Sequence, residues 1–115
     1  MAFRREAPFD RGLDLLPVRS KPGNPSELLA SEAMRELIAE CGSRYDRVIL
    51  DTPAALGLPD GPTVAELCDG AVVVVRAGMT PLEDVEAALE LLDRRRVIGL
   101  VLNDAEQGRA HYGYY

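Results

Sequence analysis

The sequence has little of several residue types on which common kinds of site depend. Its 115 residues include two cysteines, one histidine and no tryptophan. Cys41 and Cys68 have neither CxxC spacing nor histidine neighbours, which favours reduced, at least partly buried thiols over a metal or redox site. His111 stands in a polar terminal stretch without a fixed partner, so a solvated side chain is a better interpretation than a catalytic one.

Long apolar runs and an excess of positive charge are also absent. No run approaches the roughly 20 residues of a membrane-spanning helix, and the N-terminus lacks the apolar core of a secretion signal. The 13 basic and 19 acidic residues give a net charge of -6, the wrong sign for neutralising nucleic-acid phosphates. We therefore expect a cytoplasmic protein with no membrane span and no nucleic-acid partner.

Short apolar runs alternate with longer amphipathic ones from Gly12 to Asn103, which predicts an α/β fold with a mostly parallel sheet of about four strands and flanking helices. The segments predicted as strands are 13–18 (LDLLPV), 47–50 (RVIL), 71–75 (AVVVV) and 97–102 (VIGLVL). Because 48–50 is continuously apolar, we expect that strand to be central and covered on both faces.

Capping signals mark the predicted helices. Asn24, Pro25 and Glu27 predict a helix that ends near Gly42, a short helix is expected over about 63–67, and the Thr80-Pro81 pair begins another. We expect three parts: a flexible N-terminal segment over 1–11, an α/β domain over 12–104 and a tyrosine-rich tail over 105–115. The basic run 94–96 is interpreted first as a helix C-terminal charge complement and second as an anion patch.

Asp51 directly follows the predicted strand 47–50, in the stretch VILDTPA. Phosphoryl-transfer enzymes use a carboxylate in this place to hold Mg²⁺ near phosphates, although such an aspartate often only caps the next loop or helix. In a parallel sheet the loops that carry Asp51, Asp60 and Asn103 would converge at one edge. A phosphate-binding loop with a GK[ST] pattern is missing, and Lys21, the one lysine, lies in a loop without it.

Six segments in order, GLDLLPV, NPSELLASEAMRELI, RYDRVILDTP, CDGAVVVVRAGMTP, ALELLD and VIGLVLN, resemble the C-terminal part of the kinase domain of bacterial tyrosine autokinases. These enzymes act in capsule and exopolysaccharide synthesis and export, and belong with the MinD and ParA proteins among P-loop ATPases. The resemblance covers nearly everything from Gly12 to Asn103, and HYGYY resembles the family's terminal tyrosine cluster. It implies a partial P-loop NTPase-like, Rossmann-like three-layer domain.

The resemblance also implies roles for individual residues, with Mg²⁺ and ATP as cofactors. Asp51 matches the Walker B aspartate of the Mg²⁺ shell, Asp60 would orient the metal or the attacking tyrosine, and Asn103 matches a position that meets adenine. The implied phosphoacceptors are Tyr112, Tyr114 and Tyr115.

The sequence departs from the family in three places. The Walker A and A′ segments are missing, Ala54 replaces the second proline of the usual DTPP, and Asp104 follows Asn103 in place of Gly, Lys or Arg. We therefore expect no activity from the chain alone, and either a homo-oligomer or a partner chain that supplies the Walker A half. Because the strand 47–50 lacks its P-loop neighbour, we expect oligomerisation through it or a rearranged sheet.

The resemblance further implies a membrane polysaccharide copolymerase or adaptor as a partner, which would place the protein at the inner face of the membrane. Two alternatives stay open. One is a non-catalytic interaction or regulatory module that binds a kinase or a membrane adaptor. The other is a fragment of a partitioning-type ATPase, which would have no need of a tyrosine tail.

Overall fold

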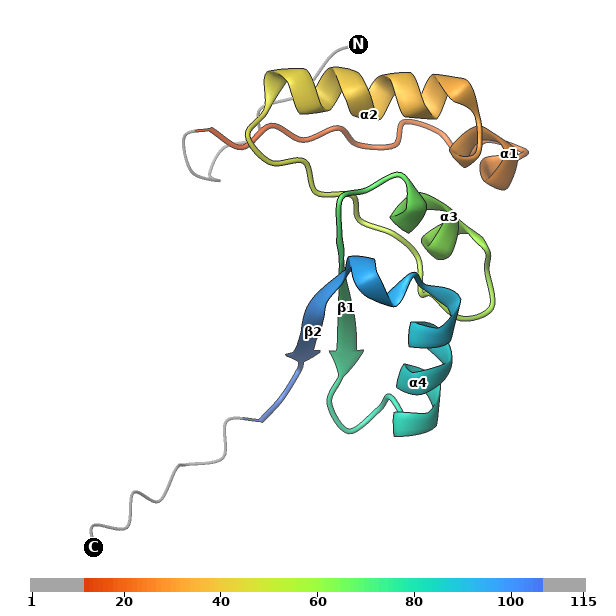
Figure 1. Cartoon of the computed structure of the whole chain (residues 1–115). Coiled ribbons are helices and arrows are strands. Elements are labelled where there is room, and N and C mark those ends of the chain that lie inside the picture. The colour runs from red at the N-terminus through yellow and green to blue at the C-terminus, as the bar shows by residue number, and fades with distance from the viewer. Residues whose placement is uncertain (1–11, 107–115) are drawn as a thin grey trace, which may run out of the picture.

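The computed structural model describes residues 12–106, which are drawn in colour in Figure 1. Its elements are α1 (Pro25–Leu29), α2 (Glu32–Arg44), α3 (Asp60–Glu66), β1 (Ala71–Arg76), α4 (Leu82–Leu91), the 3₁₀ helix η1 (Arg94–Arg96) and β2 (Val97–Asn103). The parallel strands and flanking helices confirm the predicted α/β class.

The best-formed part is the β1–α4–β2 unit. β1 and β2 pair in parallel, with Val72 opposite Gly99 and Arg76 opposite Asn103. Four consecutive valines favour an extended backbone in β1, and α4 makes the crossover that a parallel pair requires. The helix buries Val85 and Ala88, and it lies beside the strand pair in Figure 1.

The predicted number of strands is wrong for the described residues, which form a sheet of two strands and not four. Segment 13–18 contributes a single bridge residue, Leu15, and segment 47–50 is in no strand. The expected central position of 47–50 is therefore not observed. A strand needs a neighbour for its backbone N–H and C=O groups, and the neighbour that the resemblance implies for 47–50 is the missing P-loop strand. Oligomerisation through this segment or a rearranged sheet stays a prediction.

The predicted helix from Asn24 to Gly42 is two helices, separated at Ser31. The Ser31 hydroxyl donates to the Leu28 carbonyl at 2.6 Å and accepts from the Met34 N–H at 3.3 Å. One side chain thus ends α1 and caps α2. The Asn24 side chain makes no hydrogen bond to the backbone of α1, and its amide nitrogen donates to the Glu27 carboxylate at 2.9 Å.

The third helix, α3, begins three residues before the predicted Thr63. Pro59 stands at its N-cap position, and the Thr63 hydroxyl donates back to the Pro59 carbonyl at 2.8 Å. The early start makes Asp60 and Gly61 part of the helix. Both are buried, so the start of α3 is fixed in the interior.

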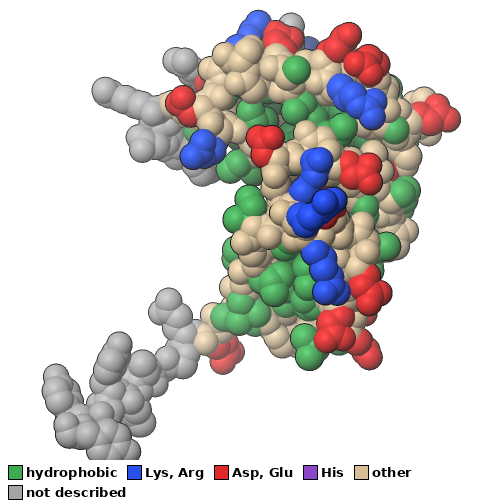
Figure 2. Space-filling model, viewed as in Figure 1, with side chains coloured by type: hydrophobic (Ala, Val, Ile, Leu, Met, Phe, Trp, Pro, Cys, Tyr) green, Lys and Arg blue, Asp and Glu red, His purple; other side chains and the backbone are tan. Residues whose placement is uncertain are grey.

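The hydrophobic core is small. The buried apolar residues are Cys41, Val64, Val85 and Ala88, and none of the described residues is completely buried. Large apolar side chains of both strands are more than half exposed: Val72, Val74, Ile98, Leu100 and Leu102. Val72 and Val74 share one face of the strand pair, whereas Leu100 and Leu102 pair with Val73 and Val75 and lie on the other face. We call the five residues on both faces together the uncovered strand surface. Figure 2 shows hydrophobic side chains at the surface over the strand-bearing half of the molecule.

No described helix combines the length and the apolar character that crossing a bilayer requires. The two cysteines are free thiols, with Cys41 buried and Cys68 half-buried, as predicted. Burial, and next the neighbouring Asp69 carboxylate, raise the pKa of the Cys68 thiol, which keeps it protonated and unreactive.

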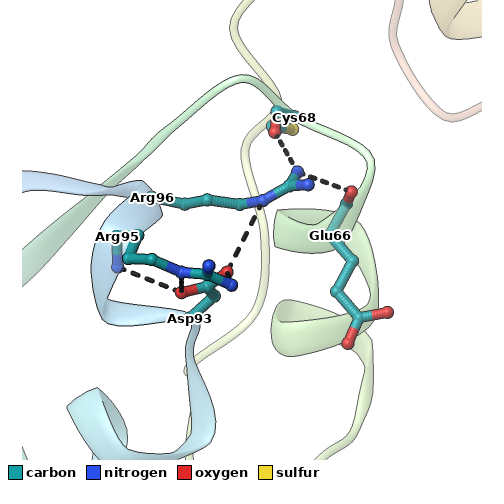
Figure 3. A network of polar contacts seen from close by, with 5 residues as sticks. All are labelled: Glu66, Cys68, Asp93, Arg95 and Arg96. Atoms are coloured by element: carbon teal, nitrogen blue, oxygen red, sulfur yellow. Dashed lines mark hydrogen bonds and ion pairs between the residues drawn. The ribbon is translucent and has the colours of Figure 1, made fainter.

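Arg96 joins η1 to the end of α3 (Figure 3). Its guanidinium Nη1 donates to the Glu66 carbonyl at 3.0 Å and to the Cys68 carbonyl at 2.8 Å. Hydrogen bonds from Arg95 hold the pKa of the Asp93 carboxyl below its usual range, and Asp93 also lies 4.0 Å from Arg96. The basic run therefore does complement a helix C-terminus, but Arg96 acts on α3 and not on the preceding helix α4.

We expect Arg96→Ala to lower the free energy of unfolding by about 1–2 kcal/mol, because two carbonyls at the end of α3 lose their donor. The midpoint of urea unfolding measures this effect. Arg94→Ala is the matched control, since Arg94 makes no side-chain hydrogen bond or ion pair within residues 12–106. Equal midpoints for the two variants would contradict a capping role of Arg96.

Candidate functional site

Asp51 lies in an extended, exposed stretch between α2 and α3. Pro53 restricts the residue before it to extended backbone, which keeps the chain from turning into a helix directly after Asp51. Within the part of the chain that the structure describes, the Asp51 carboxylate makes no hydrogen bond and no ion pair. Its oxygens are available to a ligand from solvent, and a capping role is not observed.

The loop after Asp51 folds back onto the start of α3. A Cβ atom on Gly61 would lie 3.4 Å from the Ala55 Cα and 3.5 Å from the Pro53 carbonyl oxygen. The absence of a side chain at Gly61 therefore lets the backbone of 53–55 approach the helix. This contact places the loop of Asp51 against the residue that follows Asp60.

Asp60 is buried, with 8% of its surface exposed. Its carboxylate accepts a hydrogen bond from the Ser26 hydroxyl at 2.7 Å, across 34 positions of sequence. The structure thus brings Asp60 and the Asp51 loop together, and adds Ser26 from α1. No sequence pattern predicted a role for Ser26.

Asn103 ends β2, where its carbonyl oxygen accepts from the Ala77 N–H at 2.8 Å. No hydrogen bond or ion pair found within residues 12–106 joins Asn103 to Asp51 or Asp60. In Figure 1, β2 and α3 lie on opposite sides of β1. The loops of the three residues were expected to converge at one sheet edge, but Asn103 makes no polar contact with Asp51 or Asp60. Segment 47–50 lies outside the sheet, so the position of Asp51 is not fixed at the sheet edge.

Arg76 and Asp104 close the carboxyl ends of the two strands. The Arg76 Nε donates to Asp104 Oδ2 at 2.8 Å, and Asp104 adopts a φ of 54°, a conformation that aspartate tolerates better than most residues. The pair offsets the negative charge that Asp104 would otherwise place beside Asn103.

Tyr45 is the one tyrosine among the described residues. Its hydroxyl donates to Asp14 Oδ2 at 2.7 Å, which ties the extended segment before α1 to the end of α2. This hydrogen bond is the main cause that raises the pKa of the Tyr45 phenol. His111 and the predicted phosphoacceptors Tyr112, Tyr114 and Tyr115 lie outside the described residues.

The donor set around Asp51 fits Mg²⁺ only in part. The described residues hold no cluster of three or more histidine, cysteine, aspartate or glutamate side chains that could bind a metal ion. Mg²⁺ in phosphoryl-transfer sites usually keeps several waters and takes one or two carboxylates plus substrate phosphates. Asp51 can serve as one such ligand, and the remaining ligands would have to come from water and phosphates held elsewhere.

The groove beside the Asp51 loop is unsuited to phosphates. An open depression of about 360 Å³ lies between residues 55–59, α3 and Leu91, and its lining is mostly apolar. Its one charged lining residue is Glu66, which is acidic. Phosphate binding normally uses backbone N–H groups at a helix start together with a cation, and this lining supplies no cation.

Together these features define a class of protein. A parallel β–α–β unit, preceded by an extended segment that ends in an exposed aspartate, is part of an α/β domain. No protein-family model matches the chain.

Curated relatives match most of this chain. The chain is 35% identical over 113 residues to the tyrosine-protein kinase YwqD of Bacillus subtilis, a match of 96% of this chain and 48% of YwqD. It is 40% identical over 107 residues to wzc of Salmonella typhimurium, a match of 89% of this chain and 15% of wzc. The homologues are bacterial tyrosine-protein kinases, and this chain corresponds to part of them.

Solved structures agree with the curated relatives. The kinase domain of VpsO superposes with a TM-score of 0.76 at 33% identity, over 83% of this chain and 48% of that one. The kinase domain of the Escherichia coli tyrosine kinase ETK gives a TM-score of 0.63 at 31% identity, over 81% and 38%. The chain thus spans about half or less of the proteins that it matches, and its fold is similar to part of a kinase domain.

Proposed function

We propose that this chain is the C-terminal half of a bacterial protein-tyrosine autokinase domain that acts in capsule or exopolysaccharide synthesis and export. The observation that carries the proposal is the match of 96% of the chain to a tyrosine-protein kinase. The exposed Asp51 carboxylate, which has no polar partner within residues 12–106, supports it. A residue that only stabilises a loop would be engaged in a hydrogen bond.

Asp51 would act in the Mg²⁺ shell, where the metal neutralises charge on the phosphates during transfer. Asp60 would help to orient the metal or the attacking tyrosine, and Asn103 would meet the adenine base of ATP. Tyr112, Tyr114 and Tyr115 would accept phosphate, each gaining about -1.5 to -2 charges. On a chain with a net charge of -6, that gain would loosen contacts between neighbouring acidic subunits.

The group that binds the triphosphate would come from another chain that carries the P-loop half; without such a chain, this one would form a homo-oligomer that lacks the phosphate-binding loop. A membrane polysaccharide copolymerase or adaptor would hold the assembly at the inner face of the membrane. Joining this chain to the part of YwqD that it does not cover, and following phosphotyrosine in the tail, tests the proposal. A folded fusion without phosphotyrosine would overturn it.

The uncovered strand surface favours a second candidate, a non-catalytic interaction module. More than half of each of its five large apolar side chains is exposed, as in a protein that is completed by a partner. This candidate predicts no ATP binding in calorimetry of the isolated chain or of the fusion, together with association with a full-length kinase or a membrane adaptor. Each relative described above is a tyrosine-protein kinase, so a partitioning-type ATPase gains no support from them.

A further inference from the structure

The contact between Ser26 and Asp60 is the starting point. Ser26 lies in α1, a helix of five residues with no buried residue. So short a helix does not persist in water by its own hydrogen bonds, so α1 depends on attachment to the rest of the fold. Its one side-chain hydrogen bond to α3 is the 2.7 Å bond from the Ser26 hydroxyl to Asp60.

The Asp60 carboxylate depends on the same bond. The residue is buried, and a buried carboxylate that loses its donor loses the compensation for its lost hydration. Within residues 12–106, every buried side-chain nitrogen or oxygen has a hydrogen-bond partner. Removing the Ser26 hydroxyl would therefore displace Asp60 toward water.

A displacement of Asp60 would reach Asp51 through Gly61. Gly61 is the next residue of α3, and the backbone of 53–55 packs where its side chain would be. Among the described residues, Asp51 has no polar contact of its own to hold it. The packing of 53–55 against α3 is thus a contact that holds the Asp51 loop in place.

We propose that Ser26 is a positioning residue: its hydroxyl holds Asp60, and through the start of α3 it holds the loop that carries Asp51. The catalytic part of this inference rests on the proposed function of Asp51. The role belongs to the hydroxyl group, so Ser26→Thr should preserve it and Ser26→Ala should remove it.

Amide hydrogen exchange of the full chain tests the structural part. Ser26→Ala and Asp60→Ala are each expected to speed exchange over residues 54–61 roughly fivefold, about the effect of one lost hydrogen bond on a local opening equilibrium. Both substitutions remove the same hydrogen bond, between Ser26 and Asp60. The double variant should therefore exchange no faster than Asp60→Ala. Ser26→Thr should exchange like the parent chain. Ser43→Ala, which removes another helix serine hydroxyl bonded only to the nearby Glu40 carbonyl, should leave the loop unchanged.

Kinetics of the fusion with the complementary part of YwqD test the catalytic part. Ser26→Ala should lower kcat about tenfold with the KM for ATP unchanged, and Ser26→Thr should restore kcat.

Unchanged exchange in Ser26→Ala would overturn the positioning role. Faster exchange with normal kcat, while Asp51→Asn is inactive, would overturn the catalytic part and leave the proposed function standing. A folded parent fusion without activity would overturn the proposed function, and the exchange result would then decide the structural part alone.

Discussion

Joined behind the part of YwqD that it does not cover, this chain is expected to phosphorylate its terminal tyrosines, whereas the isolated chain is expected to gain no phosphate from Mg²⁺ and ATP. The isolated chain has no GK[ST] loop, and Lys21 lies in an exposed segment before α1. Losing even one preorganised donor to a transition-state charge costs about 10²–10³-fold in rate, so losing the whole phosphate cradle should abolish detectable transfer. Mass spectrometry of the tail measures the result.

Asp51→Asn in the active fusion should lower the rate by about 10²-fold or more, because the amide removes the negative charge that attracts Mg²⁺. Asp46→Asn is the matched control: it neutralises another exposed aspartate in the segment after α2, five residues earlier. Strong autophosphorylation by the isolated chain would contradict the half-domain interpretation. A fusion that keeps its rate after the Asp51→Asn change would remove Asp51 from the metal shell.

Val74→Asp is expected to destabilise the fusion much more than the isolated chain. In the isolated chain Val74 is 63% exposed, so a carboxylate there should cost about 1 kcal/mol or less, mainly through lower strand propensity, and should reduce self-association. In a completed parallel sheet both faces are covered, and the same carboxylate would be buried without a partner. We expect a loss of about 3 kcal/mol or more there.

Urea unfolding of both proteins, together with size-exclusion chromatography of the isolated chain, measures these two effects. Met79→Asp is the control, because Met79 is 68% exposed in the turn after β1 and should tolerate a charge in either protein. If Val74→Asp shifted the unfolding midpoint equally in the chain and the fusion, the face that carries Val74 would be an ordinary exterior and not the unfinished part of a sheet.

Sequence patterns predicted the C-terminal half of the fold closely. The expected strands 71–75 and 97–102 are β1 and β2 with one further residue each. These elements were predictable because a β–α–β unit supplies its own strand neighbour and its own crossover helix. Segment 47–50 has the same apolar signal but no neighbour among the described residues, so its composition could not decide its structure.

The candidate site was predictable only where local sequence fixes it. The sequence itself shows an aspartate at the end of an apolar run, and in the structure Asp51 is exposed after an extended segment. The bond from Ser26 to Asp60 spans 34 residues, and no spacing rule signals it. The break at Ser31 was not predicted, because a serine among apolar residues at helical spacing is usually interpreted as a solvent-facing helix residue. In the structure the Ser31 hydroxyl donates a hydrogen bond to the Leu28 carbonyl.

The small core also bears on how long this polypeptide survives in a cell. A fold in which none of the described residues is completely buried opens often, and proteases act on opened states. If the P-loop half covers the strands, it stabilises the chain by mass action. The abundance of this chain would then follow the supply of its partner, and surplus copies would be degraded before they could bind one another.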